Sequence, residues 1–454
     1  MAEARPSETL SRTSFGILFC VSIVVAIGNT GLQSVLPSMS RELGFKDWMA
    51  PAIFSLSAVL WAIMSPIWAR QSDLRGRKPL IMLGLIGFLI SMVLCGLVIS
   101  AGLHHVFGYL AVFILFLFAR ATFGLIGSAS NPATQAYLAE RTSRETRTEQ
   151  MAGLASAFGL GTVVGPVLAS ILVVPVLSFA GPLFAFALIA GGMLVVVFKY
   201  LPEKPVPMVK DARPFSQAGV GGFIRNLGKL LGDPRLAPFL IFGFLVSACQ
   251  TAQGQILGFM IIDKLHVPAS ETQRYTAMAM MAGAMAGLLA QWGLIRIFRM
   301  SPAALMRWGV GLAAIANLMT AFAHDYLTVV LGFALGSLGY SFARPGFTAG
   351  ASLTVGMGEQ AQTAGAIAMV NGLNVVLGPL FVAIYGFNSA APFLINALVL
   401  AALTFYAMRN PMLRTAGEKA TADAITSPSD DLVGDTAEEK VTLALLEKSD
   451  EGGA

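Results

Sequence analysis

Residues 72–79, SDLRGRKP, separate two long apolar stretches at residues 50–69 and 79–101. Each stretch is long enough to cross the roughly 30 Å hydrocarbon core of a bilayer, because a helix rises about 1.5 Å per residue. Four of the eight residues between them are charged, so this short segment belongs in water. The pattern predicts two membrane-spanning helices joined by a charged loop.

The rest of the chain repeats this alternation. Of its 454 residues 56% are hydrophobic and 12% are charged, whereas a soluble globular protein has about 25% charged residues. This composition excludes soluble, disordered, fibrous and nucleic-acid-binding classes. Twelve apolar runs lie near residues 14–37, 50–69, 79–101, 107–135, 150–175, 180–200, 236–262, 274–295, 302–322, 326–349, 361–386 and 390–408. We expect all of them to be helices, since lipid leaves no partner for unpaired backbone groups and the runs lack the two-residue alternation of a barrel.

Lysine and arginine are concentrated in alternate connections between these runs. The basic connections follow runs two, four, six and eight, and the other side receives only Arg41, Lys46, Lys264 and Arg274. Cytoplasmic loops of membrane proteins carry the excess of basic residues. The asymmetry therefore predicts that both termini are cytoplasmic.

The longest internal connection, residues 201–235, is rich in proline and basic residues and divides the chain into two six-helix units, 14–200 and 236–408. Residues 1–13 form a cytoplasmic N-terminal segment. The tail, residues 409–454, contains ten acidic and five basic residues. Such a polar segment cannot bury enough apolar surface to fold, so we expect it to be disordered.

The two units repeat each other in sequence. Asn131-Pro132 corresponds to Arg344-Pro345, and GLGTVVGP at residues 159–166 corresponds to GLNVVLGP at residues 372–379, both at an offset of 213 residues. A parallel duplication of six-helix units produces pseudo-twofold symmetry about the membrane normal, with a site near the midplane between the units. The predicted fold is thus an all-α membrane protein of twelve helices in two pseudo-symmetric bundles.

Several motifs resemble those of one transporter family. Residues 72–79 resemble the loop signature of the major facilitator superfamily. Arg120-x-x-x-Gly124 and the fifth-span pattern Gly153-x7-Gly161-x3-Gly165-Pro166 resemble its twelve-span drug:proton antiporter branch, and residues 131–172 look most like tetracycline-efflux proteins. The resemblance covers roughly residues 14–408. Where a glycine pair usually follows the proline, this chain has Ala169-Ser170.

The resemblance implies a bacterial inner-membrane exporter of small amphiphilic compounds, of the drug or multidrug-efflux type. It implies alternating access coupled to proton antiport, by a monomer that needs only its cargo, protons and the lipid bilayer. A metabolite, siderophore or lipid exporter, an uncoupled facilitator and a membrane sensor or scaffold remain alternatives. The spans lack paired acids, metal clusters and nucleophile–base pairs, so we expect neither an enzyme nor a cofactor or metal. The excess of basic residues follows from the cytoplasmic loops, so we expect no nucleic-acid partner.

A gate between the second and third spans follows from the same resemblance. Gly76 provides a hinge between Asp73 and the basic pair Arg77 and Lys78, and Asp73 can dock on the positive N-terminal end of span eleven in one state only. Glu140, at the end of span four, is the expected partner of Arg77. The alternatives are that the basic cluster is an orientation anchor and that Glu140 is a solvated loop acid.

The fifth span contains small residues on one face. Gly161 and Gly165 are four residues apart, which allows a neighbouring backbone to approach closely. Pro166 removes a backbone donor and can kink the helix. The resemblance connects this motif with export, and the alternative is tight packing with no role in the direction of transport.

Polar side chains in the spans indicate a cavity. Amides three or four residues apart share a helix face. The candidate substrate-binding residues are three amide pairs, the lone deep cation and one methionine of an adaptable stripe on span eight: Asn29, Gln33, Gln250, Gln253, Asn371, Asn374, Arg120 and Met281. Interhelical hydrogen bonds and core packing are the alternatives for the amides and the methionine.

Carboxylates are missing from the middle of the spans. Asp263, at a span end, comes closest, and Asp73, Glu140 and Asp263 are the remaining candidates for carrying a proton. A strongly cationic compound would find no counter-ion in the membrane. We therefore expect neutral, zwitterionic or anionic amphiphiles as cargo, with Arg120 supplying the positive charge.

Overall fold

A computed structural model describes residues 10–142, 144–173, 177–203, 232–266, 269–355, 363, 366–367, 370, 372 and 374–416. Within these residues every secondary-structure element is a helix, which confirms the predicted all-α class. Asn371, the N-terminal residues 1–9, most of the 201–235 connection and the tail from residue 417 lie outside the described residues.

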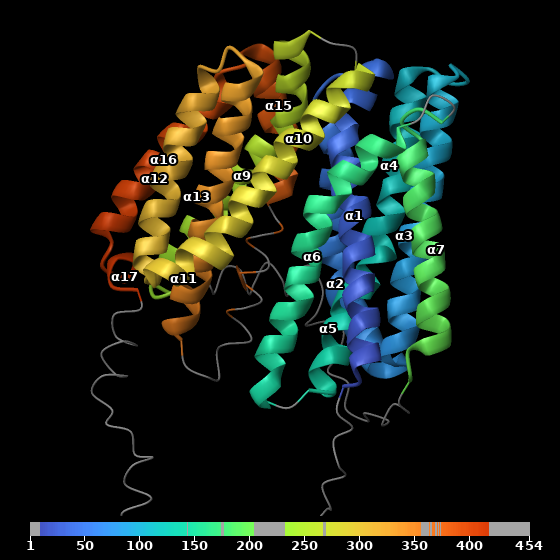
Figure 1. Cartoon of the computed structure of the whole chain (residues 1–454), viewed down its shortest axis with the longest axis horizontal. Coiled ribbons are helices and arrows are strands. Elements are labelled where there is room, and N and C mark those ends of the chain that lie inside the picture. Colours follow the sequence, from blue (N-terminus) through green and yellow to red (C-terminus); the bar gives the residue numbers. More distant parts are fainter. Residues whose placement is uncertain are drawn as a thin grey trace, which may run out of the picture.

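The elements up to residue 200 form a first helix group, shown in blue to green in Figure 1. They are α1 (Arg12–Glu42), α2 (Met49–Arg75), α3 (Arg77–Leu103), α4 (Tyr109–Leu125), the 3₁₀ turn η1 (Gly127–Ala129), α5 (Ser130–Glu140), α6 (Arg144–Leu172) and α7 (Gly181–Tyr200). The turn η1 joins α4 and α5 into the fourth predicted span.

The elements from residue 237 onward form a second helix group, beside the first and shown in yellow to red (Figure 1). They are α9 (Ala237–Leu265), α10 (Ala269–Leu288), the π-helical η3 (Leu289–Leu294), α11 (Ile295–Phe298), α12 (Pro302–Ala321), α13 (Tyr326–Leu353), the 3₁₀ turn η5 (Asn374–Leu377), α15 (Gly378–Phe387), α16 (Ala391–Arg409) and α17 (Pro411–Arg414).

Membrane-spanning potential agrees with most of the predicted runs. In the described part of the chain, ten helices are long and apolar enough to cross a bilayer, judged by length and composition. Two shorter apolar helices, Ser156–Leu172 and Asn374–Phe387, fall at the fifth and eleventh predicted spans. The total of twelve spans stays a prediction.

Polar side chains cap the starts of several helices. Ser11 Oγ accepts a hydrogen bond from the Ser14 N–H at the start of α1, at 3.1 Å. Asp325 Oδ1 accepts one from the Thr328 N–H at the start of α13, at 2.9 Å. These oxygens satisfy backbone donors that have no partner within the first turn of a helix. The caps therefore fix where these two long spans begin.

Helices α1 and α6 pack together through the predicted small residues. A Cβ added at Gly161 would lie 2.5 Å from the Cβ of Ala26, and one added at Gly165 would lie 2.6 Å from the carbonyl oxygen of Ile27. Thr30 Oγ1 also donates to the Gly161 carbonyl at 3.3 Å. Only glycine permits so close an approach, so the face predicted for backbone contact is in contact with α1.

The two groups converge at one end of the molecule, where α1, α9 and α10 meet (Figure 1). We call this the closed end and the opposite end, where α1 begins and α16 ends, the terminus end. The largest apolar cluster joins first-group residues to second-group residues near the closed end, such as Ile256–Ile261 and Tyr385. Two further clusters contain second-group residues only. Apolar burial between the groups is thus concentrated at the closed end.

Candidate functional site

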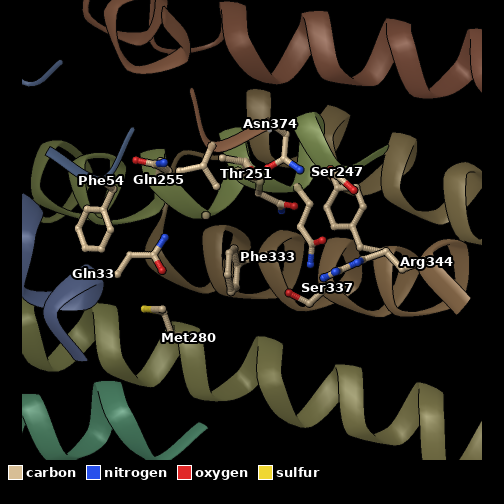
Figure 2. A pocket seen from close by; sticks show the side chains of 15 residues that line it. Gln33, Phe54, Ser247, Thr251, Gln255, Met280, Phe333, Ser337, Arg344 and Asn374 are labelled. Carbon is tan, nitrogen blue, oxygen red and sulfur yellow. Dashed lines mark hydrogen bonds between the residues drawn. The ribbon is translucent and has the colours of Figure 1, made fainter. Parts of the chain in front are cut away.

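A cavity of about 360 Å³ lies between the two helix groups. The first group contributes α1 and α2, and the second contributes α9, α10, α13 and η5 (Figure 2). Its lining consists of Gln33, Phe54, Ser247, Gln250, Thr251, Gln253, Gly254, Gln255, Met280, Phe333, Ser337, Tyr340, Arg344, Asn374 and Val375. Both groups therefore shape one space, as expected of a site between two repeated units.

Amides form the polar wall of this cavity. Of the amides predicted from helical spacing, the lining includes Gln33, Gln250, Gln253 and Asn374. Asn374 Oδ1 accepts a hydrogen bond from Thr251 Oγ1 at 2.5 Å, and Gln253 Nε2 donates to the carbonyl oxygen of Gly332 at 3.4 Å. These bonds hold two of the four amides in place. Such preformed polar groups can orient a bound molecule.

Aromatic and sulfur-containing side chains form the apolar wall. Phe54, Met280, Phe333 and Tyr340 line the cavity. Met281, which the sequence suggested, is instead 37% exposed and is absent from the lining. Neighbouring residues on a helix are rotated by about 100°, so the α10 register that points Met280 inward turns Met281 away. The methionine contribution comes from the adjacent position.

A network of amides and hydroxyls lies behind Tyr340. Asn317 Nδ2 donates to the Tyr340 hydroxyl at 3.0 Å, and Asn396 Nδ2 donates to Asn317 Oδ1 at 3.2 Å and to the Cys249 carbonyl at 3.2 Å. Asn317 and Asn396 are buried. The network joins α9, α12, α13 and α16, and it positions the aromatic ring that forms part of the cavity wall.

Arg344 on α13 is the charged residue of the lining. Its side chain is exposed to the cavity and forms no ion pair or hydrogen bond with any described residue. Among the described residues of the lining, none is an aspartate or a glutamate. Arg344 was not among the predicted substrate-binding residues. The signal was its spacing, since Phe333, Ser337, Tyr340 and Arg344 follow one another at intervals of four, three and four residues on one face of α13.

Arg120 lies behind the cavity wall. It is 2% exposed, and its Nη2 donates to Asn29 Oδ1, whereas Nε and Nη1 have no hydrogen-bond partner among the residues that the structure describes. The guanidinium carbon is 4.4 Å from the ring centre of Phe123 and 5.1 Å from that of Phe54. Neither Arg120 nor Asn29 belongs to the lining, whereas Phe54, whose ring lies beside the Arg120 guanidinium, does. The predicted positive charge of the cavity wall is therefore supplied by Arg344.

The charged loop at residues 72–79 is held by a compact set of ion pairs. Arg77 Nε donates to Glu140 Oε1 at 2.9 Å, and Arg77 Nη1 lies 2.5 Å from Asp73 Oδ1. The expected pairing of Glu140 with Arg77 is present. Lys78 Nζ donates to the carbonyl oxygen of Phe198 at 2.8 Å and ties the loop to α7.

Gly76 and Glu203 complete this loop. Gly76 joins α2 to α3 at φ +101°, in the left-handed region that favours glycine. A Cβ there would also lie 3.2 Å from the carboxyl carbon of Glu203. Burial raises the pKa of Glu203, although the backbone N–H groups of Lys78 and Arg77 act in the opposite direction. Glu203 was not predicted as part of this loop, because its contact with Gly76 depends on how α7 ends.

Arg41 joins the two helix groups at the closed end. Its Nε and Nη2 donate to the two carboxylate oxygens of Asp47 at 2.7 and 2.8 Å, and its Nη1 donates to Asp263 Oδ1 at 3.0 Å. The Tyr385 hydroxyl donates to Asp263 Oδ2 at 2.8 Å. This cluster could not be predicted beyond the span-end position of Asp263, because Arg41 and Asp263 are far apart along the chain.

Further contacts between the groups lie in the closed-end halves of their helices. Gln273 Nε2 donates to Ser34 Oγ at 3.1 Å, and Ser55 Oγ donates to the Val375 carbonyl at 2.9 Å. The three candidate proton carriers, Asp73, Glu140 and Asp263, lie at helix ends and outside the cavity lining. The cavity thus has polar, apolar and cationic walls, and the three candidate carboxylates lie outside them.

Comparison with known proteins gives the same architecture. The Major Facilitator Superfamily profile matches residues 18–379. Multidrug resistance protein 2 of Bacillus subtilis (strain 168) is 24% identical over 401 residues, covering 86% of this chain and 93% of that protein. Tetracycline resistance protein, class B, of Escherichia coli is 28% identical over 202 residues, covering 42% of this chain and 45% of that protein.

A solved structure shares the fold. The crystal structure of a bacterial homologue of the human lysosomal transporter Spinster, in an inward-facing and unoccupied conformation, has a TM-score of 0.67 and 15% sequence identity, covering 91% of this chain and 98% of that chain. The match of the family profile to most of the chain, together with the multidrug and tetracycline resistance relatives, identifies the expected family. The chain belongs to the Major Facilitator Superfamily of membrane transporters.

Proposed function

We propose that this protein exports small amphiphilic compounds across a bacterial inner membrane by alternating access. The observation that carries the proposal is a cavity with amide, aromatic and cationic walls between two helix groups that are joined at one end. A cavity in this position can be exposed to either face of the membrane if the groups rock about it. The resistance proteins among the relatives support efflux as the direction.

The proposed moving units are the six-span domains 14–200 and 236–408, connected by residues 201–235. With both termini in the cytoplasm, as the positions of the basic loops favour, the closed end faces the outside of the cell. In this proposal the conformation described above is the inward-facing state, and the transporter works as a monomer. Arg41, Asp47 and Asp263 hold the outer side shut in that state, and Asp73 and Glu140 hold the loop between α2 and α3.

Proton antiport is the proposed source of energy. Asp263 is the strongest candidate for the proton carrier, because its carboxylate contacts both Arg41 across the group boundary and Tyr385 within its own group. Protonation would remove the charge that binds Arg41 and so favour opening of the closed end. A group whose ionisation changes the contacts of one state couples proton binding to the conformational equilibrium.

Transport by purified protein tests this proposal. Proteoliposomes are incubated with a panel of neutral, zwitterionic and anionic amphiphiles, including tetracycline, with and without an imposed pH gradient. The expected result is uphill, protein-dependent movement of at least one compound that stops when the gradient is collapsed. Movement that is the same with and without the pH gradient would indicate an uncoupled facilitator. No movement above that of protein-free vesicles would contradict the export proposal.

A further inference from the structure

Arg344 is placed where a transported molecule would lie. It stands about one helical turn beyond the middle of α13 (Tyr326–Leu353). Side chains of a helix tilt toward its N-terminus, so Arg344 is directed back along α13 toward the middle of the span. Figure 2 shows the guanidinium extending from its ribbon toward Ser337, among the residues of the lining. The charge is thus inside the cavity.

This charge has no counter-ion in the described part of the cavity. Arg344 makes no hydrogen bond or ion pair with a described residue, and the described residues of the lining include no carboxylate. Arg120, whose guanidinium carbon lies 5.1 Å from the ring centre of Phe54, adds a second positive charge near the lining. Unpaired cations inside a membrane are costly and create a positive potential, which disfavours cations and favours an anion.

The remaining lining suits the rest of an amphiphile. Phe54, Phe333 and Met280 provide polarizable apolar surface. Gln250 and Gln255 provide donors and acceptors for neutral polar groups. A guanidinium presents its donors in a planar fork that matches two oxygens of a carboxylate or sulfonate. The walls therefore provide separate places for a charged head and an apolar body.

We infer that Arg344 is the anchoring residue for cargo that carries a single anionic head, a carboxylate or sulfonate, on an aromatic or aliphatic body. This inference rests on the proposed export function and specifies its substrate class. It assigns the recognition of charge to Arg344. Arg120 keeps its role inside the first group, where it is bound to Asn29.

A matched set of three probes tests the inference. 1-Naphthylacetate, 1-naphthylacetamide and 1-naphthylmethylammonium carry the same ring with a negative, a neutral and a positive head. Binding to the purified full-length protein is measured by equilibrium dialysis. The acetate is expected to bind at least tenfold more tightly than the amide and the ammonium, since a hydrogen bond to a charged group is worth roughly ten- to hundredfold in affinity.

Three variants test whether Arg344 causes the preference for the acetate. Arg344→Gln should reduce the preference for the acetate over the amide to within about threefold, and Arg344→Lys should keep part of it, because the charge remains and the fork is lost. Arg296→Gln, which removes the same charge from an exposed position on α11, is the control and should bind as the wild type does. Size-exclusion profiles and thermal midpoints verify folding of each variant.

The inference is overturned if Arg344→Gln retains the preference, if the wild type binds the ammonium or the amide as tightly as the acetate, or if it binds none of the three. Flux in proteoliposomes separates this failure from failure of the export proposal. Movement of the amide without preference for the acetate would leave export standing and remove the anion site. Preferential binding of the acetate without any protein-dependent movement would leave the anion site standing and contradict the export proposal.

Discussion

Arg41 Nη1 lies 3.0 Å from Asp263 Oδ1, and this ion pair connects the end of α1 in the first helix group to the end of α9 in the second. Asp47 holds the rest of the same guanidinium in a bidentate contact, and Tyr385 holds the other carboxylate oxygen of Asp263. One arginine therefore links both groups through fixed partners. A contact of this kind stabilises the state in which the closed end is shut.

Asp263→Asn should weaken the closed end. The side chains of the pair are 32% and 38% exposed, so solvent reduces its strength to that of a surface ion pair, about 1 kcal/mol or less. We expect the fraction of molecules in which the two helix groups are separated at the closed end to rise about two- to fivefold. The measurement is the rate at which a membrane-impermeant thiol reagent added on that face modifies a Ser337→Cys variant.

Asp233→Asn is the matched control for this prediction. Asp233 pairs with Arg235 only two residues away, before the start of α9, and the pair does not connect the groups. Its substitution should leave the modification rate unchanged. An Asp263→Asn rate no higher than that of the control would show that the ion pair does not hold the closed end.

Gly165→Ala should destabilise the packing of α1 on α6. The added methyl group would lie 2.6 Å from the Ile27 carbonyl oxygen and 3.0 Å from the Gly31 nitrogen, so two backbones must separate. Overpacking of this kind costs about 1–3 kcal/mol. We expect a lower thermal midpoint in detergent. Gly159→Ala, on the same helix with nothing within 4 Å of the new Cβ, should leave the midpoint unchanged or raise it slightly.

Equal midpoints for these two alanine variants would contradict the packing. A lower midpoint for Gly165→Ala with normal flux at low temperature would separate packing from transport. It would show that the glycine face holds α1 and α6 together without setting the direction of export.

The stability contributed by Glu203 should decrease as pH rises. Burial raises the pKa of its carboxyl in the folded state, so between the unfolded and folded values the folded protein binds more protons than the unfolded one. The contribution is therefore complete below the unfolded pKa and is lost as pH rises through the folded pKa. Glu203→Gln cannot titrate, so its thermal midpoint relative to the wild type should be higher at pH 8 than at pH 4.5.

The quantity to compare is the difference in thermal midpoint between Glu203→Gln and the wild type, because all other titrating groups are common to the two proteins. A difference that is constant across this pH range, or that changes in the opposite direction, would contradict the raised pKa of the Glu203 carboxyl beside Gly76.

Spacing within single helices predicted much of the cavity. Gln33, Gln250, Gln253 and Asn374 line it because polar side chains in apolar helices turn away from lipid, and that rule needs only local sequence. Spacing did not resolve the rotation of α10, where Met280 rather than Met281 faces the cavity. A difference of about 100° between neighbouring residues is set by packing against other helices.

Contacts between distant segments were beyond such reasoning. Arg41 and Asp263 are 222 residues apart, and no periodicity relates them. Arg344 and Arg120 were each visible as cations in apolar spans. Which of the two meets the cavity depends on Phe54, a residue of a third helix that stands beside Arg120. Apolar runs in the sequence predicted the helices, but the packing of the helices against one another determines which of these cations lines the cavity.

Locking the closed end tests the rocking of the two groups most directly. A Cβ added at Gly258 would lie 2.7 Å from the Cβ of Pro37, close enough for a disulfide after a shift of about 1 Å. The test protein carries P37C, G258C and S337C, with alanine at Cys20, Cys95 and Cys249. Modification at position 337 by an impermeant methanethiosulfonate is followed by peptide mass spectrometry in sealed vesicles, with reagent added to one face at a time.

With the disulfide reduced, position 337 should be modified from both faces of the membrane as the groups alternate. With the disulfide formed, modification should continue from the face that carries the termini and stop from the other. Modification of the oxidised protein from the closed-end face at the reduced rate, or of the reduced protein from one face only, would contradict alternating access around this cavity.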